Sequence, residues 1–395
     1  MKTIRWATRY AVSCATAMVL IPLSVSAPAV AAPAAAPLTA SSAPKAQTAS
    51  ALSLPRPTGP YAVGRDTLHL VDDRRADPWA PQSGPRQLMV DLYYPARTNS
   101  GTPAAYMSTA EASALITYAG LSGALEPARL ADTRTWARAG AAPARGRYPL
   151  VVLSPGFTVP RYTLTALAEE LSSRGFVVAA VDHAHESAAT RFPDGILPCT
   201  ACDAYNSGAA TQEQIAAGRA RDVSFLLTEL TGPRSVWRYS TLIDPARIGM
   251  AGHSAGGDAT LAAMGADRRV LAGVDLDGAI TPPVPATGIG GRPVLLIAAA
   301  DPSGPDIVPS WTSSWPNLDG WKRWLTVAGA DHYTFTDLDY LVDESGVLPI
   351  PNAPRSIAIT TSYVGAFFER QLKGICEPLL NGPSRDFPEV AFTRP

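Results

Sequence analysis

From Tyr148 onward, short apolar runs alternate with helical patterns, and this alternation constrains the fold more than any other feature. Uninterrupted apolar runs of strand length indicate strands that are buried on both faces, as in parallel sheets. Between some of them, residues 163–174 and 213–230 place apolar side chains on one helical face, and residues 356–372 do so after the last run. The alternation predicts a mostly parallel, doubly wound α/β sheet flanked by helices. The apolar runs are residues 149–153, 176–181, 248–251, 270–276, 294–300 and 324–327.

The N-terminal part of the chain gives weaker patterns. Residues 67–71 and 87–94 are predicted strands, whereas residues 104–142 have an Ala- and Gly-rich helical pattern. We expect one catalytic domain over residues 58–376 and a C-terminal tail over residues 377–395. Several long connections are expected to cap or shape a site. These are residues 100–147, 184–210 and 302–320.

The extreme N-terminus has the pattern of a secretory signal peptide. Three basic residues precede a short apolar run, and Ala29-Val30-Ala31 then supplies the small residues of a cleavage site. The run is too short for a membrane anchor. We therefore expect residues 1–31 to be removed and the protein to be secreted without a stable membrane anchor. Residues 32–57, rich in Pro, Ala and Ser, are a predicted linker.

Charge and composition exclude some functions. The chain has 33 Lys and Arg residues against 34 Asp and Glu residues, so its net charge is −1. Nucleic-acid binding proteins carry a basic stripe that this balance does not indicate. Hydrophobic residues make up 46%, which is enough for a sizeable core. We expect a globular monomer with no nucleic-acid partner.

A G-x-S-x-G motif directly follows one of the apolar runs. It reads Gly252-His253-Ser254-Ala255-Gly256 and opens an Ala-rich helix. Small residues at both ends of the motif allow a turn so tight that the serine is exposed on strained backbone. The helix points free N–H groups toward the reacting atoms. A strand–turn–helix context of this kind is a nucleophile elbow, and it predicts Ser254 as the nucleophile.

A serine nucleophile needs a base, and histidine is the usual one. Sites with this elbow have the order serine, acid, histidine along the chain. Of the five histidines, His332 alone follows Ser254, and it is the predicted base. Two residues are candidates for the acid. Asp277 and Asp301 each end a predicted strand, where a carboxylate can reach the C-terminal edge of the sheet.

Four motifs together resemble a known family. They are the strand and loop at 149–157, the strand at 175–183, the elbow, and Leu276-Asp277. In order and spacing they resemble the platelet-activating-factor acetylhydrolase-like branch of the α/β-hydrolase fold. This branch includes secreted bacterial esterases such as feruloyl esterases, and the resemblance covers roughly residues 59–374.

The resemblance implies a complete site. In that branch the acid follows the strand after the nucleophile, which favours Asp277, whereas the related cutinases and polyester hydrolases take it from the next strand, which would be Asp301. The backbone N–H groups of Phe157 and Ala255 would bind the oxyanion. The family's His-Gly is Pro155-Gly156 here, which removes a side-chain contribution to the oxyanion hole but not the backbone groups.

Several other residues carry weaker predictions. Cys199 and Cys202 are separated by two residues in an expected loop, which favours a disulfide in an exported protein over a redox pair. The sequence leaves open whether Cys376 pairs. Trp311 and Trp315 are candidates for the wall of an acyl or aromatic pocket, or for simple packing.

These patterns predict a serine carboxylesterase that uses a Ser254–His332–Asp277 triad and an acyl-enzyme. The expected substrates are small or polymer-linked esters, first of all hydroxycinnamate esters. The alternatives are a lipid esterase, a polyester hydrolase, and, with less support, a serine peptidase or a non-catalytic binding relative. No cofactor is implied, and no metal is expected because no Glu and His set completes a site around His183 and His185.

Overall fold

The computed structural model describes residues 51–301 and 304–394. The predicted signal peptide and most of the predicted linker lie outside these ranges. The strands are β1 (Ala62–Ala76), β2 (Pro85–Ala96), β3 (Thr102–Pro103), β4 (Ala137–Ala139), β5 (Tyr148–Ser154), β6 (Val177–His183), β7 (Arg191–Phe192), β8 (Gly195–Ile196), β9 (Ile243–His253), β10 (Val270–Leu276), β11 (Val294–Ala299), β12 (Lys322–Val327) and β13 (Val390–Arg394). The helices are α1 (Thr109–Tyr118), α2 (Pro127–Ala131), α3 (Thr165–Ser173), α4 (Thr200–Asn206), α5 (Gln212–Thr231), α6 (Ala255–Ala266), α7 (Ile307–Ser314), α8 (Asp337–Ser345) and α9 (Ala353–Lys373).

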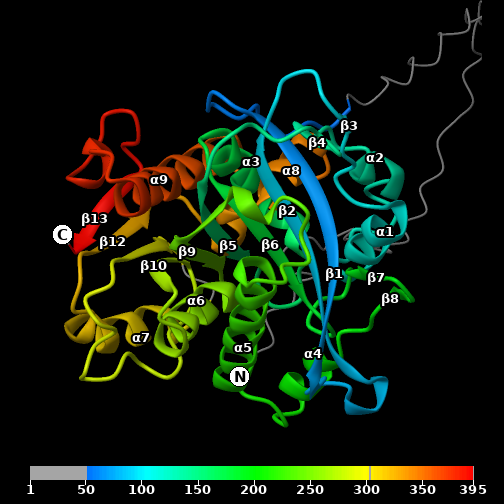
Figure 1. Cartoon of the computed structure of the whole chain (residues 1–395). Coiled ribbons are helices and arrows are strands. Elements are labelled where there is room, and N and C mark those ends of the chain that lie inside the picture. The colour runs from blue at the N-terminus through cyan, green and yellow to red at the C-terminus, as the bar shows by residue number, and fades with distance from the viewer. Residues whose placement is uncertain (1–50, 302–303, 395) are drawn as a thin grey trace, which may run out of the picture.

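Most of the strands form one central sheet (Figure 1). Its order is β13-β12-β11-β10-β9-β5-β6-β2-β1-β4-β3. The strands from β6 through β5, β9, β10 and β11 to β12 are parallel, and β1 and β2 extend the sheet as an antiparallel hairpin. The α/β-hydrolase fold class predicted from the sequence is confirmed.

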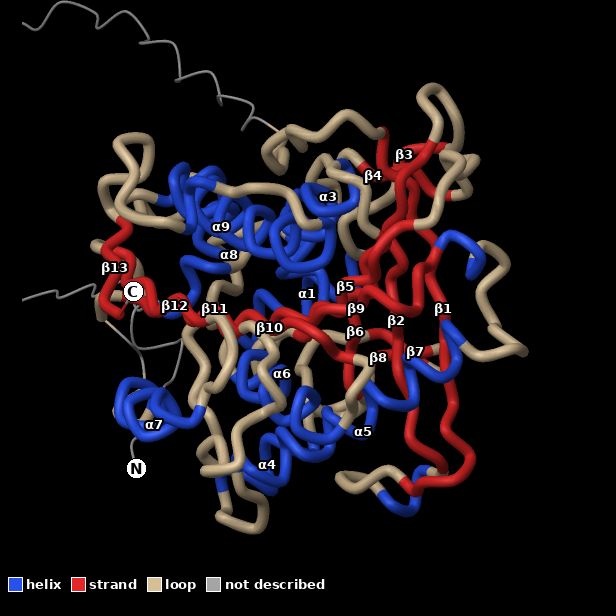
Figure 2. The backbone as a smooth tube through the Cα atoms, turned by 60° about the vertical axis from the view of Figure 1, so that its left-hand side comes forward, coloured by secondary structure: helices blue, strands red, loops and turns tan. Residues whose placement is uncertain are grey.

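Helices cover both faces of the sheet, so the parallel strands are buried on both sides. Figure 2 shows α3, α8 and α9 on one face and α5 and α6 on the other. Along β5, Leu150 and Val152 belong to the core under α5 and α6, whereas Val151 and Leu153 belong to the core under α3 and α9. This two-sided burial is the reason that these strands are apolar without alternation.

Local sequence signals set the ends of the main helices. A capping box begins α5, because the Thr211 hydroxyl accepts from the Gln214 N–H and the Gln214 side chain accepts from the Thr211 N–H. Gly374 ends α9 in the left-handed conformation that glycine favours, with φ 70°. The long connection 302–320 contains α7, and 184–210 contains β7, β8 and α4.

The structure corrects two predicted boundaries. Leu52 and Leu54 of the predicted linker are buried in a third core, which also includes apolar residues of α1, α2 and α8. The predicted C-terminal tail contributes β13, which pairs antiparallel with β12 at the edge of the sheet. Both segments are short and lack a periodic pattern, so their order depends on the surface they pack against. None of the described helices is long and apolar enough to cross a membrane.

Candidate active site

Ser254 lies at the sharp turn between β9 and α6. Its backbone has φ 56° and ψ −122°, a combination that residues with a side chain rarely adopt. A Cβ atom at Gly252 would lie 2.1 Å from the carbonyl group of Gly256, and one at Gly256 would lie 2.0 Å from the backbone oxygen of Ser154. Glycine is required at both positions, and the structure has the elbow that the motif predicts.

His332 lies beside Ser254 although 78 positions separate them in the sequence. It begins a 3₁₀ turn after β12, where the carboxylate of Asp331 accepts from the Tyr333 N–H at 3.0 Å. The Nε2 atom of His332 lies 2.9 Å from Ser254 Oγ, and its Nδ1 atom lies 2.7 Å from Asp277 Oδ2. The structure therefore brings together the three residues predicted from the sequence.

The carboxylate of Asp277 is buried and held from two sides. Its Oδ1 atom accepts from the Ala299 N–H at 2.9 Å, which leaves Oδ2 directed at His332. Asp277 follows the end of β10 with φ 54°, a left-handed conformation that is uncommon outside glycine. Asp301, the alternative acid, is exposed beyond the end of β11. The carboxylate that meets the imidazole is that of Asp277.

The two backbone N–H groups predicted to bind the oxyanion belong to Ala255 and Phe157. Ala255 is the first residue of α6, and Phe157 lies in the loop after β5, the strand next to β9. Neither N–H donates a hydrogen bond to another residue of the described ranges. The ring of Phe157 packs edge to face on Tyr205 of α4, with centroids 5.7 Å apart. Free backbone donors of this kind suit a developing negative charge on oxygen.

His253 forms a hydrogen bond to the loop that carries His332. Its Nε2 atom lies 2.7 Å from the backbone oxygen of His332, so this nitrogen carries the proton and donates it. Burial and the nearby His332 lower the pKa of His253 well below its ordinary value. A neutral His253 therefore supports the His332 loop without adding charge beside it.

The two tryptophans predicted as pocket walls are part of the packing. Trp311 is fully buried in α7, and its Nε1–H donates to Gly278 O at 2.6 Å and to Asp275 Oδ2 at 3.1 Å. Trp315 is half-buried and packs on Trp324, with centroids 6.1 Å apart. The pocket prediction is wrong for Trp311, because its ring supports the strand end before Asp277. Tryptophan spacing alone does not tell a pocket wall from a core contact.

No sequence pattern predicted a second hydrogen-bonded serine, histidine and aspartate, Ser154, His183 and Asp222, which we call the buried triplet. Ser154 Oγ lies 3.1 Å from His183 Nε2, and His183 Nδ1 lies 2.8 Å from Asp222 Oδ2. All three side chains are buried. They come from the ends of β5 and β6 and from α5, so their meeting depends on the packing of that helix against the sheet.

The buried triplet is part of a larger network of buried charged side chains. Arg86 bonds to Asp222, Glu186 and Asp77, and Arg219 bonds to Glu186. Burial alone would raise the pKa of Asp222, but Arg86 and His183 lower it well below its ordinary value. Burial and Arg219 lower the pKa of His183, so its imidazole is neutral. The two arginines and three carboxylates are fully or almost fully buried.

The remaining cysteine and histidine residues form no metal site among the described residues. Cys199 and Cys202 form a disulfide at the start of α4, whereas Cys376 is exposed and free. His185 Nδ1 lies 3.2 Å from the backbone oxygen of Pro198. Asp182, next to the two histidines at the end of β6, pairs with Arg161.

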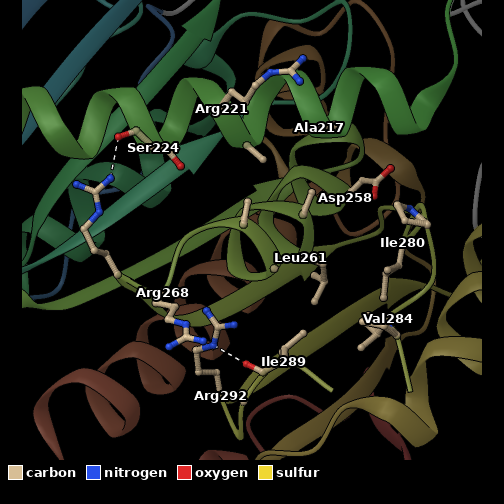
Figure 3. A pocket seen from close by; sticks show the side chains of 18 of the residues that line it. Ala217, Arg221, Ser224, Asp258, Leu261, Arg268, Ile280, Val284, Ile289 and Arg292 are labelled. Atoms are coloured by element: carbon tan, nitrogen blue, oxygen red, sulfur yellow. Dashed lines mark hydrogen bonds between the residues drawn. The ribbon is translucent and has the colours of Figure 1, made fainter. Parts of the chain in front are cut away.

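A large groove lies beside α5 and α6 (Figure 3). It has a volume of about 1440 Å³ and runs between α5, α6 and the loop 280–292. Arg268 and Arg292 gather at one end in Figure 3, whereas Ile280 and Val284 lie at the other. Neither Ser254 nor His332 lines it. The groove therefore contains neither the predicted nucleophile nor the predicted base.

Comparisons with known proteins show which family the chain resembles. Residues 46–194 match the family described as platelet-activating factor acetylhydrolase, isoform II. A probable 1-alkyl-2-acetylglycerophosphocholine esterase of Arthroderma benhamiae is 30% identical over 379 residues, which cover 87% of this chain and 94% of that one. A platelet-activating factor acetylhydrolase of Cavia porcellus is 28% identical over 152 residues, which cover 33% and 35% of the two chains.

The fold is also similar to that of a solved esterase. The structure of a ferulic acid esterase from Streptomyces cinnamoneus matches with a TM-score of 0.76 and 41% identity. The match covers 87% of this chain and all of the other. The chain therefore belongs to the platelet-activating-factor acetylhydrolase-like family of α/β-hydrolases, and it is a carboxylic-ester hydrolase.

Proposed function

We propose that the protein is a secreted serine esterase in which Ser254, His332 and Asp277 form the catalytic triad. The observation that carries this proposal is the continuous chain of hydrogen bonds from the serine hydroxyl through the imidazole to the buried carboxylate. An acceptor carboxylate at Nδ1 requires that this nitrogen carry the proton, which leaves Nε2 free to accept the serine proton. The elbow backbone supports the proposal because it presents the hydroxyl at the edge of the sheet.

The proposed reaction has two halves. In the first, Ser254 Oγ attacks the carbonyl carbon while His332 Nε2 takes the hydroxyl proton, and the oxyanion accepts from the N–H groups of Phe157 and Ala255. Each such donor typically supplies about 10²–10³ in rate. The bond to the alcohol then breaks as His332 returns the proton to it. In the second half, water activated by the same imidazole attacks the acyl-enzyme and releases the acid.

We propose hydroxycinnamate esters, small or polymer-linked, as the substrate class. The 41% identity to a ferulic acid esterase over 87% of the chain supports this class. Aromatic side chains beside the reacting residues also support it: Phe157 packs on Tyr205, and Tyr333 packs on His332 with centroids 5.3 Å apart. An aromatic acyl group can stack on rings of this kind.

A short-acyl phospholipid is the second candidate substrate. It is favoured by the fungal relative, a probable acetylglycerophosphocholine esterase that matches over nearly its whole length. A cutinase-like polyester hydrolase has less support, because the acid that contacts His332 is Asp277 and not Asp301.

A hydrolysis panel tests the proposal. Methyl ferulate, a short-acetyl phospholipid, tributyrin and a polyester film would be offered to the full-length mature protein, with p-nitrophenyl acetate as a general probe. We expect the highest kcat/KM on methyl ferulate and complete loss of turnover after a serine-directed phosphonate. Turnover that survives the phosphonate would contradict a serine mechanism, and a preference for the phospholipid would replace the aryl class with the second candidate.

Secretion is tested separately by N-terminal sequencing. We expect the exported protein to begin near Ala32, after the small residues of the predicted cleavage site. A product that retains residues 1–31 would contradict removal of a signal peptide.

A further inference from the structure

The loop between Ser154 and Val159 is tied at its two ends to a buried, hydrogen-bonded pair, Glu186 and Arg219. At its far end, the Thr158 N–H donates to the backbone oxygen of Glu186 at 2.9 Å. At its near end, the Pro155 carbonyl accepts from Arg219 Nη1 at 2.5 Å, and Arg219 Nε donates to Glu186 Oε2 at 2.7 Å. The loop is thus held by the backbone of Glu186 at its far end and by the side chain of Arg219 at its near end.

The unit of Glu186 and Arg219 is rigid because it is buried and its charges are matched. Each side chain is 1% exposed. The second carboxylate oxygen of Glu186 accepts from Arg86 at 2.7 Å and from Trp79 Nε1 at 2.9 Å. Burial alone would raise the pKa of Glu186, but Arg219 and Arg86 lower it, so the carboxylate stays ionised. Charge-assisted bonds of this kind in a water-free site fix geometry more firmly than surface pairs do.

The loop backbone is strained at Thr158, and the segment 186–188 holds it there: besides the bond to Glu186, the Thr158 carbonyl accepts from the Ala188 N–H at 3.1 Å. Thr158 has φ 77°, a left-handed conformation that is unfavourable for a β-branched residue. Pro155 has no N–H, and Gly156 restricts the backbone little. A Cβ at Gly156 would lie 2.9 Å from His253 Nδ1, so the loop also passes close to the elbow. Such a conformation persists only where the surroundings determine it.

Between the two tied positions lies Phe157, whose N–H has no partner among the described residues. We propose that Glu186 and Arg219 are a positioning pair for ester hydrolysis: they hold the Phe157 N–H where the oxyanion forms. This inference rests on the proposed function, in which Ser254 is the nucleophile and Phe157 an oxyanion donor. Neither side chain touches substrate, and both act through the backbone of the loop.

The pair contributes to the transition state more than to substrate binding. The negative charge on the carbonyl oxygen develops only after attack, so a misplaced N–H lowers kcat and leaves KM nearly unchanged. A displacement of about 1 Å in a supporting group costs about 10² in rate. We therefore expect Glu186→Gln/Arg219→Gln, which removes both charges together, to lower kcat about 10²-fold.

The decisive readout compares an ester with its thionoester, in which C=S replaces C=O. Sulfur is larger than oxygen and accepts hydrogen bonds weakly, so the thionoester gains little from a well-placed N–H. The double variant should lose about 10² on the ester and less than tenfold on the thionoester. Arg221→Gln is the matched control, because Arg221 is exposed on the same helix; both of its rates should stay unchanged.

A second variant covers the case in which the double variant does not fold. Arg219→Lys keeps the charge beside Glu186, but a single nitrogen cannot donate to Glu186 and Pro155 in the same geometry. We expect the ratio of ester to thionoester rates to fall about tenfold in this variant. An unchanged ratio of ester to thionoester rates would overturn the positioning role, whether both rates fall equally or neither falls. If Ser254→Ala keeps its activity, the proposed function itself fails, whatever the ratio.

Discussion

Two regions of this protein place a serine, a histidine and an aspartate in the same order of hydrogen bonds. At the elbow, Ser254 Oγ lies 2.9 Å from His332 Nε2, whose Nδ1 lies 2.7 Å from an aspartate. Between α5 and the sheet, Ser154 Oγ lies 3.1 Å from His183 Nε2, whose Nδ1 lies 2.8 Å from an aspartate. The distances differ by at most 0.2 Å, so hydrogen-bond geometry does not distinguish the two.

Solvent exposure and backbone conformation do distinguish the two sites. Ser154 ends a regular strand and is completely buried, as is the His183 side chain. Ser254 is half-exposed on a strained turn, and the side chain of His332 is 15% exposed. A carbonyl carbon can approach a hydroxyl on a turn at the sheet edge, whereas the core excludes it. These differences support the proposed catalytic role of the elbow and a structural role for the buried triplet.

The electrostatic surroundings differ in the same direction. The Ser154 hydroxyl and the neighbouring Pro155 carbonyl both accept from Arg219, a cation that opposes protonation of His183. Asp222 is shared with two arginines, Arg86 and Arg75, so its charge is already compensated. In contrast, Asp277 bonds to a backbone N–H and to His332. A catalytic base must gain a proton during the reaction. His183 is held neutral by its surroundings, so it is poorly suited to that role.

The largest expected effect separates the two serines. Ser254→Ala should lower kcat about 10⁶-fold without unfolding the protein, because it removes the nucleophile. Ser154→Ala should lower kcat less than tenfold and reduce the free energy of unfolding by about 1–3 kcal/mol, because buried partners lose a hydrogen bond. Turnover of p-nitrophenyl acetate and urea denaturation measure the two quantities. A larger loss of activity at Ser154 would reverse the assignment.

The next effect concerns the acid at the elbow. Asp277→Asn should lower kcat about 10⁴-fold, because the amide is uncharged and can stabilise the wrong tautomer of His332. Asp301→Asn is the control and should cost less than tenfold, roughly 1.4 kcal/mol of barrier. Both variants should keep their circular dichroism spectra. The opposite ranking would point to an acid from the next strand, as in cutinases.

Asp222→Asn should act on stability instead. It leaves buried Arg86 with one charged partner fewer, and breaking a buried pair typically costs about 3–5 kcal/mol. We expect the midpoint of urea denaturation to fall strongly, while kcat of the fraction that stays folded changes much less than in Asp277→Asn. If Asp222→Asn is as stable as the wild type and loses activity, the buried triplet takes part in catalysis.

The smallest effect is a pH dependence of stability. Because the pKa of His183 is lowered on folding, the unfolded chain takes up a proton first as the pH falls below about 6.5. The contribution of His183 to stability is present above that pH and is lost as the pH falls toward the lower pKa of the folded state. His183→Asn keeps a donor for Asp222 but cannot titrate.

Between pH 7.5 and 5.5 the wild type should therefore lose up to about 1.4 kcal/mol more than His183→Asn. Urea denaturation of both proteins at the two pH values measures this difference. Equal losses would mean that His183 binds its proton equally well in the folded and unfolded states.

The sequence by itself determined the parts of the molecule that depend on neighbouring residues. Apolar runs such as 294–300 predicted the parallel strands, because burial on both faces leaves no room for polar side chains. The capping box at Thr211 and the glycines of the elbow are likewise local requirements of helix ends and tight turns. His332 followed from its position after Ser254 and from there being no other histidine downstream.

Tertiary structure decided every choice between residues that look alike along the chain. Asp277 and Asp301 both follow strands, and only the fold directs the first at His332. The buried triplet joins the ends of β5 and β6 to Asp222 in the middle of α5. No local sequence pattern shows that this helical aspartate faces the sheet. The C-terminal strand and the packing of Trp311 are of the same kind. Local sterics and burial act over a few residues and leave a period in the sequence, whereas a contact across the fold leaves none.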